Sequence, residues 1–520
     1  MTIQLDMFEV QLGAAILLQF GEDAERVRVL ADAGVKASGY PRDHVHNKVS
    51  VLLDEHGPRR IDLIIGTHYD EDHLLGLVPI IEDETIEIGE AWMPPVVNDA
   101  LPQALDKRIE ADDLLPHQLA GDGGEQVLAE YMAAKRLAIE TVRVLEQDDP
   151  HDGNLNRHLR ELRNERFQAA TELDWFRAEL GESEEADCRD HGIQQEIDPS
   201  PEVERTIALA QSGQLGPFWD YPWHHDFPQQ HRLAMAIRSQ QPEVGEAQSR
   251  SLANIRKAAA KDAINAKALH EVVQALGRRG IAIRCEIIED GEPRRYRWNP
   301  VKRQFLPSRP ASGGLTFDLL GPSRSLVNKH RERLPVEDAT KVALSFRGEL
   351  LSITPSNQLS YIGRFECNEQ GILVSGDAGC VDFKPRSGPY YPKLLKAMLP
   401  LHVVQVAHHA GNNAHFYRVL AAADYPEQAA PSLMLLSHAF HDRTRPSPAF
   451  RQFLLETLRE GEDVRLLFTS RPQLSKVADY VTAIHPSVGD TGKVGDIQLK
   501  FVDGNWSVTR HGVDPSALTN

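Results

Sequence analysis

The sequence has few of the features that build disulfide-stabilised, secreted or membrane-spanning proteins. Its 520 residues include only four cysteines, which are scattered and form no C-x-x-C pair. This excludes a disulfide framework and a cysteine-type zinc site. No stretch approaches the ~18 apolar residues that cross a bilayer, and the first residues lack the basic segment and apolar core of a signal peptide. We therefore expect a cytoplasmic protein that has no membrane partner.

The sequence also lacks the commonest catalytic and phosphate-binding motifs. It contains no G-x-S-x-G elbow and no P-loop, so no motif in it indicates a serine hydrolase or an NTPase. The net charge of −19 repels polyanions at long range, which argues against broad electrostatic binding to duplex DNA. A local cationic groove, or metal ions in a site, would still be able to hold one or two phosphates.

The pattern of residue types along the chain divides it into three parts. Residues 1–99 alternate between short apolar runs and turns, as strands do, and residues 263–520 return to that pattern. Between them, residues 100–262 are rich in Ala, Leu, Glu and Arg with helical periodicity, which indicates a helical insertion. We expect the last helix of this insertion, Ser249–Leu276, to run on into the second core segment.

The most informative motif is Thr-His-Tyr-Asp-Glu-Asp-His at residues 67–73. It follows the apolar run 61–66, which is typical of a buried strand that ends in a tight turn. Two imidazoles and two carboxylates at a strand end suit divalent ions such as zinc, manganese or iron. The four candidate metal ligands are His68, Asp70, Asp72 and His73.

Further candidate ligands follow three later apolar runs. Residues 371–376 lead to Asp377, residues 401–407 lead to His408 and His409, and residues 433–437 lead to His438. Ligands at successive strand ends are how an α/β sandwich concentrates a site at one rim. The order of these motifs therefore strengthens the prediction of a metal site.

The same motifs carry a resemblance to the metallo-β-lactamase superfamily. The first motif of that superfamily is usually H-x-H-x-D-H, and this chain has Asp70 in the place of the second His. The H-x-D-x-D-H form resembles the hydrolase domain of the competence protein ComEC and its soluble relatives. Leu30-Ala31-Asp32-Ala33-Gly34, Ser375-Gly376-Asp377 and Val406-Ala407-His408-His409-Ala410-Gly411 are similar to further elements of the same family.

The resemblance implies an αββα metallo-β-lactamase sandwich with a large helical insertion. It implies two divalent metal ions, Zn or Mn, with His68 and Asp70 on one ion, Asp72 and His73 on the other, and Asp377 bridging. One of His408 or His409 would complete the first site, and the other would orient substrate or donate a proton. A hydroxide shared by two ions is a strong nucleophile at neutral pH. We therefore expect Asp72, Asp377 and His409 to be the catalytic residues.

The implied activity is that of a metal-dependent phosphodiesterase or nuclease. One alternative is a hydrolase of small esters, lactones or phosphocholine-type molecules. Another is an effector subunit of a multi-component, defence-type system, activated by a protein partner that docks on the insertion. A single-stranded nucleic acid or a nucleotide is the expected substrate in the leading hypothesis.

The chain departs from the family pattern at two places near the site. Ala410 stands where the family has Gly, and Arg445 stands where the last motif has a His. His438 and His441, slightly upstream of Arg445, are the candidates to supply the missing imidazole. We expect Asp32 to support the site through hydrogen bonds rather than to bind metal directly.

Two weaker signals lie outside this set. Basic residues and two aromatic residues, Tyr296 and Trp298, interleave between positions 294 and 303, which would suit the backbone and bases of a nucleic acid. An exposed strand or a salt-bridge surface would give the same pattern. The loop 216–226 contains His224, His225 and Asp226, and it is either a second metal site, a partner-docking loop or an aromatic anchor of the insertion. The candidate nucleic-acid residues are Arg294, Arg295, Arg297, Trp298, Lys302 and Arg303.

Overall fold

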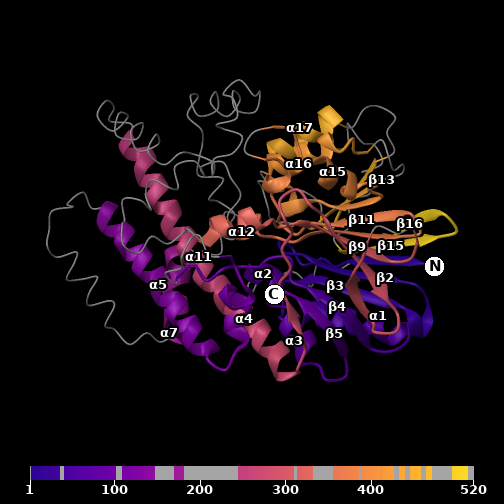
Figure 1. Ribbon diagram of the computed structural model, residues 1–520, viewed down its shortest axis with the longest axis horizontal. Coiled ribbons are helices and arrows are strands. Elements are labelled where there is room, and N and C mark those ends of the chain that lie inside the picture. Colours follow the sequence, from indigo (N-terminus) through magenta and orange to yellow (C-terminus); the bar gives the residue numbers. More distant parts are fainter. Residues whose placement is uncertain are drawn as a thin grey trace.

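A computed structural model describes most of the chain outside part of the helical region and several loops. The described residues are 2–34, 40–100, 108–146, 169–180, 244–309, 313–331, 355–385, 388–411, 413–426, 432–439, 445–457, 464–470 and 495–512. Among them, the protein is a mixed α/β structure built on two eight-stranded sheets (Figure 1).

The first sheet joins the two ends of the described chain. In spatial order its strands are β16 (Asn505–Gly512), β15 (Gly495–Val502), β1 (Ile3–Met7), β2 (Ala15–Phe20), β3 (Val27–Ala33), β4 (Arg60–Ile65), β5 (Glu87–Trp92) and β6 (Ile283–Arg284). The strands from β16 to β3 pair antiparallel, and β3 to β6 pair parallel. The first two strands thus form an antiparallel hairpin.

The second sheet is assembled from the later part of the chain. Its order is β14 (Val464–Phe468), β13 (Ser432–Leu436), β12 (Val403–Gln405), β11 (Gln370–Val374), β10 (Ile362–Cys367), β9 (Thr316–Gly321), β7 (Arg294–Asn299) and β8 (Gln304–Pro307). The strands β11 to β14 are parallel, and their carboxyl ends therefore lie at one rim. That rim carries the candidate ligands.

The two sheets face each other across a shared apolar core. Along β4, Leu63 and Ile65 belong to this core, whereas Ile64 between them belongs to the cluster on the opposite face of the first sheet. This alternation is the period of a strand that is buried on both sides. Aromatic rings cross the interface between sheets, with Phe20 and Phe365 at a centroid distance of 6.0 Å.

Helices cover the outer faces of both sheets (Figure 1). Apolar residues of α1 (His44–Glu55) and α3 (Leu77–Glu82) join the cluster on the outer face of the first sheet. Residues of α15 (Pro392–Met398), α16 (Ala414–Ala422) and α17 (Pro448–Thr457) join the core of the second sheet. Shorter elements are η1 (Asp23–Glu25), α2 (Glu71–Leu74), η2 (Ala111–Asp113), α12 (Arg324–Arg331), α14 (Pro355–Gln358), η6 (Val381–Phe383) and η7 (Ala407–Ala410).

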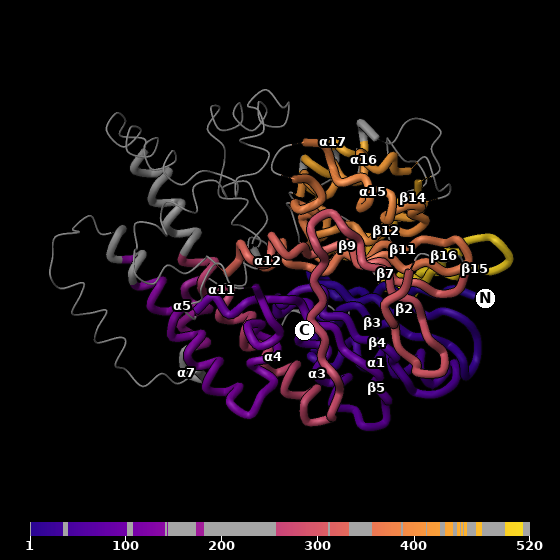
Figure 2. The backbone as a smooth tube through the Cα atoms, in the orientation of Figure 1, coloured from indigo at the N-terminus to yellow at the C-terminus, as the bar shows by residue number. Residues whose placement is uncertain are grey.

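The described part of residues 100–262 is helical, as its periodicity predicts. It contains α4 (Leu115–Ala120), α5 (Gly124–Glu146), α7 (Ala169–Leu180) and the first half of α11 (Val244–Arg278). The helix α11 packs against α4, α5 and α7, and it also contacts α2 and α3 (Figure 2). It then leads directly to β6, so the long helix connects the helical region to the first sheet.

Short elements follow the first motif and the long helix. The helices α2 and α3 are separate, because Pro79 has no N–H to bond the carbonyl of Leu75. After α11, residues 281–288 form only the two-residue strand β6 and a bridge from Ile288 to Ser323. The loop 216–226, with His224, His225 and Asp226, is among the residues not described. Among the described helices, none combines the length and apolarity needed to span a membrane.

Candidate metal centre

The loop after β4 delivers its four predicted ligands to the interior. Thr67 is fixed by a hydrogen bond from the Tyr361 N–H to its carbonyl (2.7 Å), and the short helix α2 then begins after Asp70. The His73 N–H bonds back to the Asp70 carbonyl over 3.0 Å, which keeps the turn tight. The side chains of His68, Asp70, Asp72 and His73 all lie in the buried class.

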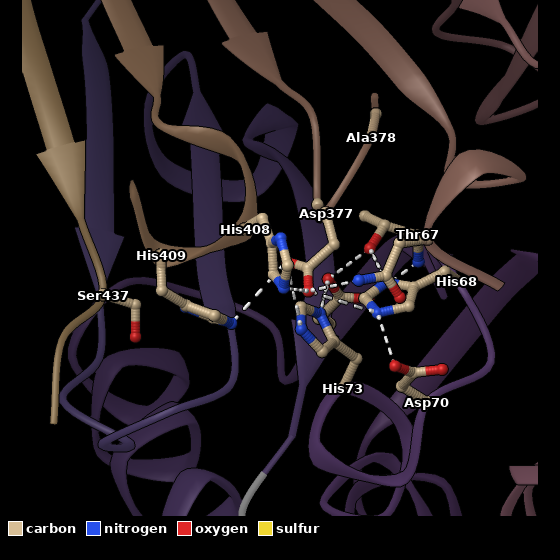
Figure 3. A network of polar contacts seen from close by, with 12 residues as sticks. Thr67, His68, Asp70, His73, Asp377, Ala378, His408, His409 and Ser437 are labelled. Carbon is tan, nitrogen blue, oxygen red and sulfur yellow. Dashed lines mark hydrogen bonds and ion pairs between the residues drawn. The ribbon is translucent and has the colours of Figure 1, made fainter. Parts of the chain in front are cut away.

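Asp377, immediately after β11, lies at the centre of the site (Figure 3). Its Oδ2 lies 3.8 Å from His68 Nε2 and 4.0 Å from His408 Nε2. Its Oδ1 lies 3.6 Å from both His73 Nε2 and His409 Nε2. One buried carboxylate therefore faces four imidazole nitrogens from two other segments of the chain.

An unusual backbone aims the two later histidines at Asp377. His408, His409 and Ala410 all have left-handed φ values, of 54°, 51° and 59°. Such a conformation costs a non-glycine residue about 1–3 kcal/mol and clusters at functional sites. The His408 N–H bonds the Gly376 carbonyl (3.2 Å), which ties this strained turn to the loop that carries Asp377.

The ligands divide into two groups around the two oxygens of Asp377. We call subsite A the group at Oδ2, which is His68, His408 and also Asp70, whose Oδ2 is 3.7 Å from His68 Nε2. We call subsite B the group at Oδ1, which is His73, His409 and also Asp72. The ligand atoms of Asp72, His73 and His409 all lie within 4.8 Å of one another, a spacing that suits a metal ion. The structure thus assigns His408 and His409 to different subsites.

Several buried polar atoms of the cluster have no hydrogen-bond partner among the described residues. His68 Nε2, His73 Nε2 and Asp377 Oδ1 are buried and accept or donate no hydrogen bond among the described residues. Burial of a polar atom without a hydrogen-bond partner costs about 1–3 kcal/mol of folding free energy, because the atom has lost its bonds to water. Coordination to a divalent ion would satisfy these atoms, so the residues present fit a metal site.

The pKa values of the histidines are shifted in two directions. Burial lowers the pKa of His408 and His409 well below the ordinary value, which leaves neutral imidazoles that can ligate. Burial alone would also lower the pKa of His73, but the carboxylates of Asp377 and Asp32 raise it to about 10. Burial raises the pKa of Asp377. A divalent cation can replace the proton that otherwise balances these carboxylates.

Asp32 supports the cluster through hydrogen bonds, as the sequence predicts. Its Oδ1 accepts the Thr67 N–H (2.7 Å), and its Oδ2 accepts the Thr67 hydroxyl (2.6 Å) and His73 Nδ1–H (2.9 Å). Asp32, His68 and His73 also lie close enough to resemble a ligand group. Because the Asp32 oxygens already accept three hydrogen bonds, we interpret Asp32 as a residue that positions His73.

The helix α11 contributes contacts that the sequence analysis did not anticipate. Lys261 Nζ lies 2.6 Å from Asp70 Oδ2, and Asn265 Nδ2 donates to Asp70 Oδ1 over 2.6 Å. Asp262 accepts the hydroxyl of Tyr69 at 2.8 Å. These polar residues share one face of a helix about 190 residues from the motif they contact. Polar residues are common along the whole of α11, so its sequence carries no signal that marks these ones.

The structure gives His438 a different environment from the other histidines. Its Nδ1 lies 3.1 Å from Ser470 Oγ, and its Nε2 lies 3.2 Å from the Arg445 carbonyl oxygen. Both ring nitrogens therefore have partners in neighbouring loops, which argues against the predicted role of His438 as a ligand. His441 lies outside the described residues. Arg445 itself is buried, and its positive charge contributes to the lowered pKa of His408.

The candidate nucleic-acid residues lie on the hairpin of β7 and β8. Arg295 makes two 2.6 Å hydrogen bonds to Asp318, and Arg303 makes two to Asp62 (2.8 and 2.9 Å). Arg294 bonds Glu286 over 2.6 Å. Arg297 and Lys302 are exposed, and Trp298 is half-buried. The arginine pairings favour the salt-bridge interpretation for half of the set, and nucleic-acid contact stays a prediction.

Comparison of the sequence with known protein families and curated proteins gave no match.

Proposed function

We propose that this chain is a metal-dependent hydrolase of the metallo-β-lactamase fold, and that its substrate is a phosphodiester. The observation that carries the proposal is the convergence on Asp377. Four imidazole nitrogens approach its two oxygens within 3.6–4.0 Å. Each of the segments that supply them was predicted from its place after a strand.

The arrangement of layers supports the αββα form of this proposal. Two mixed sheets share one core, and helices pack on the outer face of each. The site lies at the rim where β4 of the first sheet and the parallel strands β11 and β12 of the second sheet end. Ligands bind outside the carboxyl ends of strands in α/β proteins generally.

In this proposal, subsites A and B would each hold one divalent cation, zinc or manganese, with Asp377 shared. Bound cations would supply activated water and would neutralise charge on the attacked phosphoryl oxygen. The protein's own residues fix the geometry. Asp32 and Thr67 hold the His73 ring, and the left-handed turn at residues 408–410 holds the two later imidazoles. Burial of all these groups excludes bulk water and strengthens their electrostatic interactions.

The proposal is tested with the double variant Asp72→Asn, His73→Ala, which removes two ligands of subsite B. We expect it to lose bound metal, measured by elemental analysis after purification without chelator, and to lose hydrolysis. The matched control is Asp54→Asn, His56→Ala, which changes the same residue types on the surface at the end of α1. Full metal content and full activity in the first variant would refute the site.

The substrate class is tested on the wild-type chain with zinc or manganese added. Cleavage of single-stranded DNA or RNA, or of chromogenic phosphodiesters, supports the proposal. Cleavage of carboxyl esters or lactones alone would instead establish the small-molecule alternative. Hydrolysis that begins only when a co-purifying protein is added would establish the partner-activated one.

A further inference from the structure

The two subsites differ in what already holds their carboxylates. In subsite A, both oxygens of Asp70 are engaged by α11: Lys261 Nζ lies 2.6 Å from Oδ2, and Asn265 Nδ2 lies 2.6 Å from Oδ1. Asp70 is almost fully buried, and the Lys261 side chain is only 11% exposed. An ammonium group therefore sits against the oxygen of Asp70 that faces His68.

The position of Lys261 is fixed by the contacts of its neighbours on the helix. Asp262 bonds the Tyr69 hydroxyl (2.8 Å), and its other oxygen pairs with Lys135 of α5 (2.8 Å). Asn265 also accepts the N–H of Glu71 at 3.2 Å. The helix α11 is thus attached to the loop 67–73 on both sides of Asp70, through Tyr69 and Glu71.

The Lys261 ammonium places a positive charge 2.6 Å from the Asp70 carboxylate. Burial would raise the pKa of the Asp70 carboxyl, but the positive charges of Lys261 and His68 hold it below the ordinary value. Lys261 thus supplies to Asp70 the charge that a divalent ion would otherwise supply. A second cation at subsite A would have to displace this ammonium or tolerate its repulsion at close range.

We propose that Lys261 is a built-in competitor for the cation of subsite A. Subsite B then fills first, and the second cation binds more weakly because it must displace the lysine from Asp70. This inference rests on the proposed metal centre and deepens it: the helical region, through α11, sets how many cations the site holds at a given metal concentration.

The test is a calorimetric titration of the metal-free full chain with Mn²⁺, repeated with Co²⁺ and monitored by visible absorbance. For the wild type we expect two steps, the second at least about tenfold weaker, which corresponds to about 1.4 kcal/mol. In Lys261→Met the second step should tighten by at least about tenfold, while the first step should not change. Lys261→Gln keeps a hydrogen-bond donor without the charge, and it should behave as Lys261→Met does.

Lys267→Met is the matched control, because Lys267 lies on the same helix and its side chain is 29% exposed and beside Glu271. We expect the wild-type pattern from it. Equal affinities for the two cations in the wild type would overturn the inference, and this result does not depend on whether the variants fold. An unchanged affinity for the second cation in Lys261→Met and Lys261→Gln would also overturn it. Neither result would affect the proposed hydrolase. Absence of any bound cation in the wild type would instead refute the proposed metal centre itself.

Discussion

His73 is held between two carboxylates that perform different tasks. Its Nδ1 donates to Asp32 Oδ2 over 2.9 Å, while its Nε2 faces Asp377 Oδ1 at 3.6 Å. The first contact fixes the plane of the ring and holds a proton on Nδ1, so that Nε2 is the nitrogen that would give up its proton to bind a cation in subsite B. A carboxylate behind a metal-binding histidine has this effect in metalloproteins generally.

We predict that Asp32→Asn weakens metal binding by about 10- to 100-fold without unfolding the protein. The amide keeps the shape of the side chain, and asparagine tolerates the left-handed φ of 57° at this position. It nevertheless replaces one carboxylate oxygen with an N–H₂ group, which cannot accept from His73 Nδ1–H. The measurement is the Zn²⁺ dissociation constant in competition with a chromogenic chelator.

The control for this variant is Asp54→Asn, whose side chain is 61% exposed at the end of α1. It should bind Zn²⁺ as the wild type does. Equal affinity in Asp32→Asn and the wild type would show that the hydrogen bond does not position the ring for metal.

We predict that Gly34→Ala both destabilises the protein and weakens metal binding. A Cβ at Gly34 would lie 1.5 Å from the carbonyl oxygen of Asp72 and 2.3 Å from the Cα of His73, so the metal loop would have to move. Forced overpacking of this kind costs about 1–3 kcal/mol or more. Urea unfolding of the metal-free chain and a Zn²⁺ titration measure the two effects.

Gly123→Ala provides the comparison, because a Cβ there would meet no atom within 4 Å. It should be neutral or stabilise the protein by up to about 1 kcal/mol. A Gly34→Ala protein with wild-type stability and wild-type affinity would contradict the close approach of these two loops.

The candidate ligands were recognisable from sequence because each lies close to the end of a strand. The runs before Thr67, Asp377 and His408 have the apolar character of buried strands, and the spacing of polar residues after them is visible without coordinates. Pairing of His408 with one subsite and His409 with the other was not predictable. It depends on a left-handed turn that no residue type in Ala407–Ala410 specifies.

The supporting residues were less accessible to sequence reasoning. Lys261 and Asn265 reach the site because α11 packs on α2, and no local pattern near residue 70 reveals that packing. Element lengths were also hard to predict. Tertiary contacts decide the length of the short strand β6, and Pro79 separates α2 from α3. His438 was expected as a ligand from its place after a strand, yet Ser470 and the Arg445 carbonyl oxygen occupy both its nitrogens.

We predict that metal stabilises the folded protein by mass action. A ligand that binds only the native state adds about 2.7 kcal/mol to the free energy of unfolding at 100 times its dissociation constant. Thermal unfolding with and without chelator should show this increase in the wild type. The increase should be absent in Asp72→Asn, His73→Ala and retained in Asp54→Asn, His56→Ala. An increase of equal size in all three would mean that the ion binds elsewhere.

The last prediction concerns the ion triad that anchors α11 to α5 beside the metal loop. Lys135 Nζ lies 2.9 Å from Asp99 Oδ2 and 2.8 Å from Asp262 Oδ2, and its side chain is 2% exposed. Burial alone would lower the pKa of Lys135, but Asp262 and Asp99 raise it above 10.5. Because the folded-state pKa is the higher one, the stabilisation is fully present at neutral pH and is lost only as the pH rises through that raised value.

Lys135→Met should therefore cost about 3–5 kcal/mol at neutral pH, because two buried carboxylates lose their counter-charge. The exposed pair of Lys393 and Glu292 is the control, and Lys393→Met should cost at most about 1 kcal/mol. Asp262 also accepts a hydrogen bond from the hydroxyl of Tyr69, which lies between the candidate ligands His68 and Asp70 in the sequence. Lys135→Met should therefore weaken Zn²⁺ binding as well. Urea unfolding at neutral pH, with a Zn²⁺ titration of each variant, decides both points. Equal losses of stability in the two variants would show that the triad does not anchor the helix to the site.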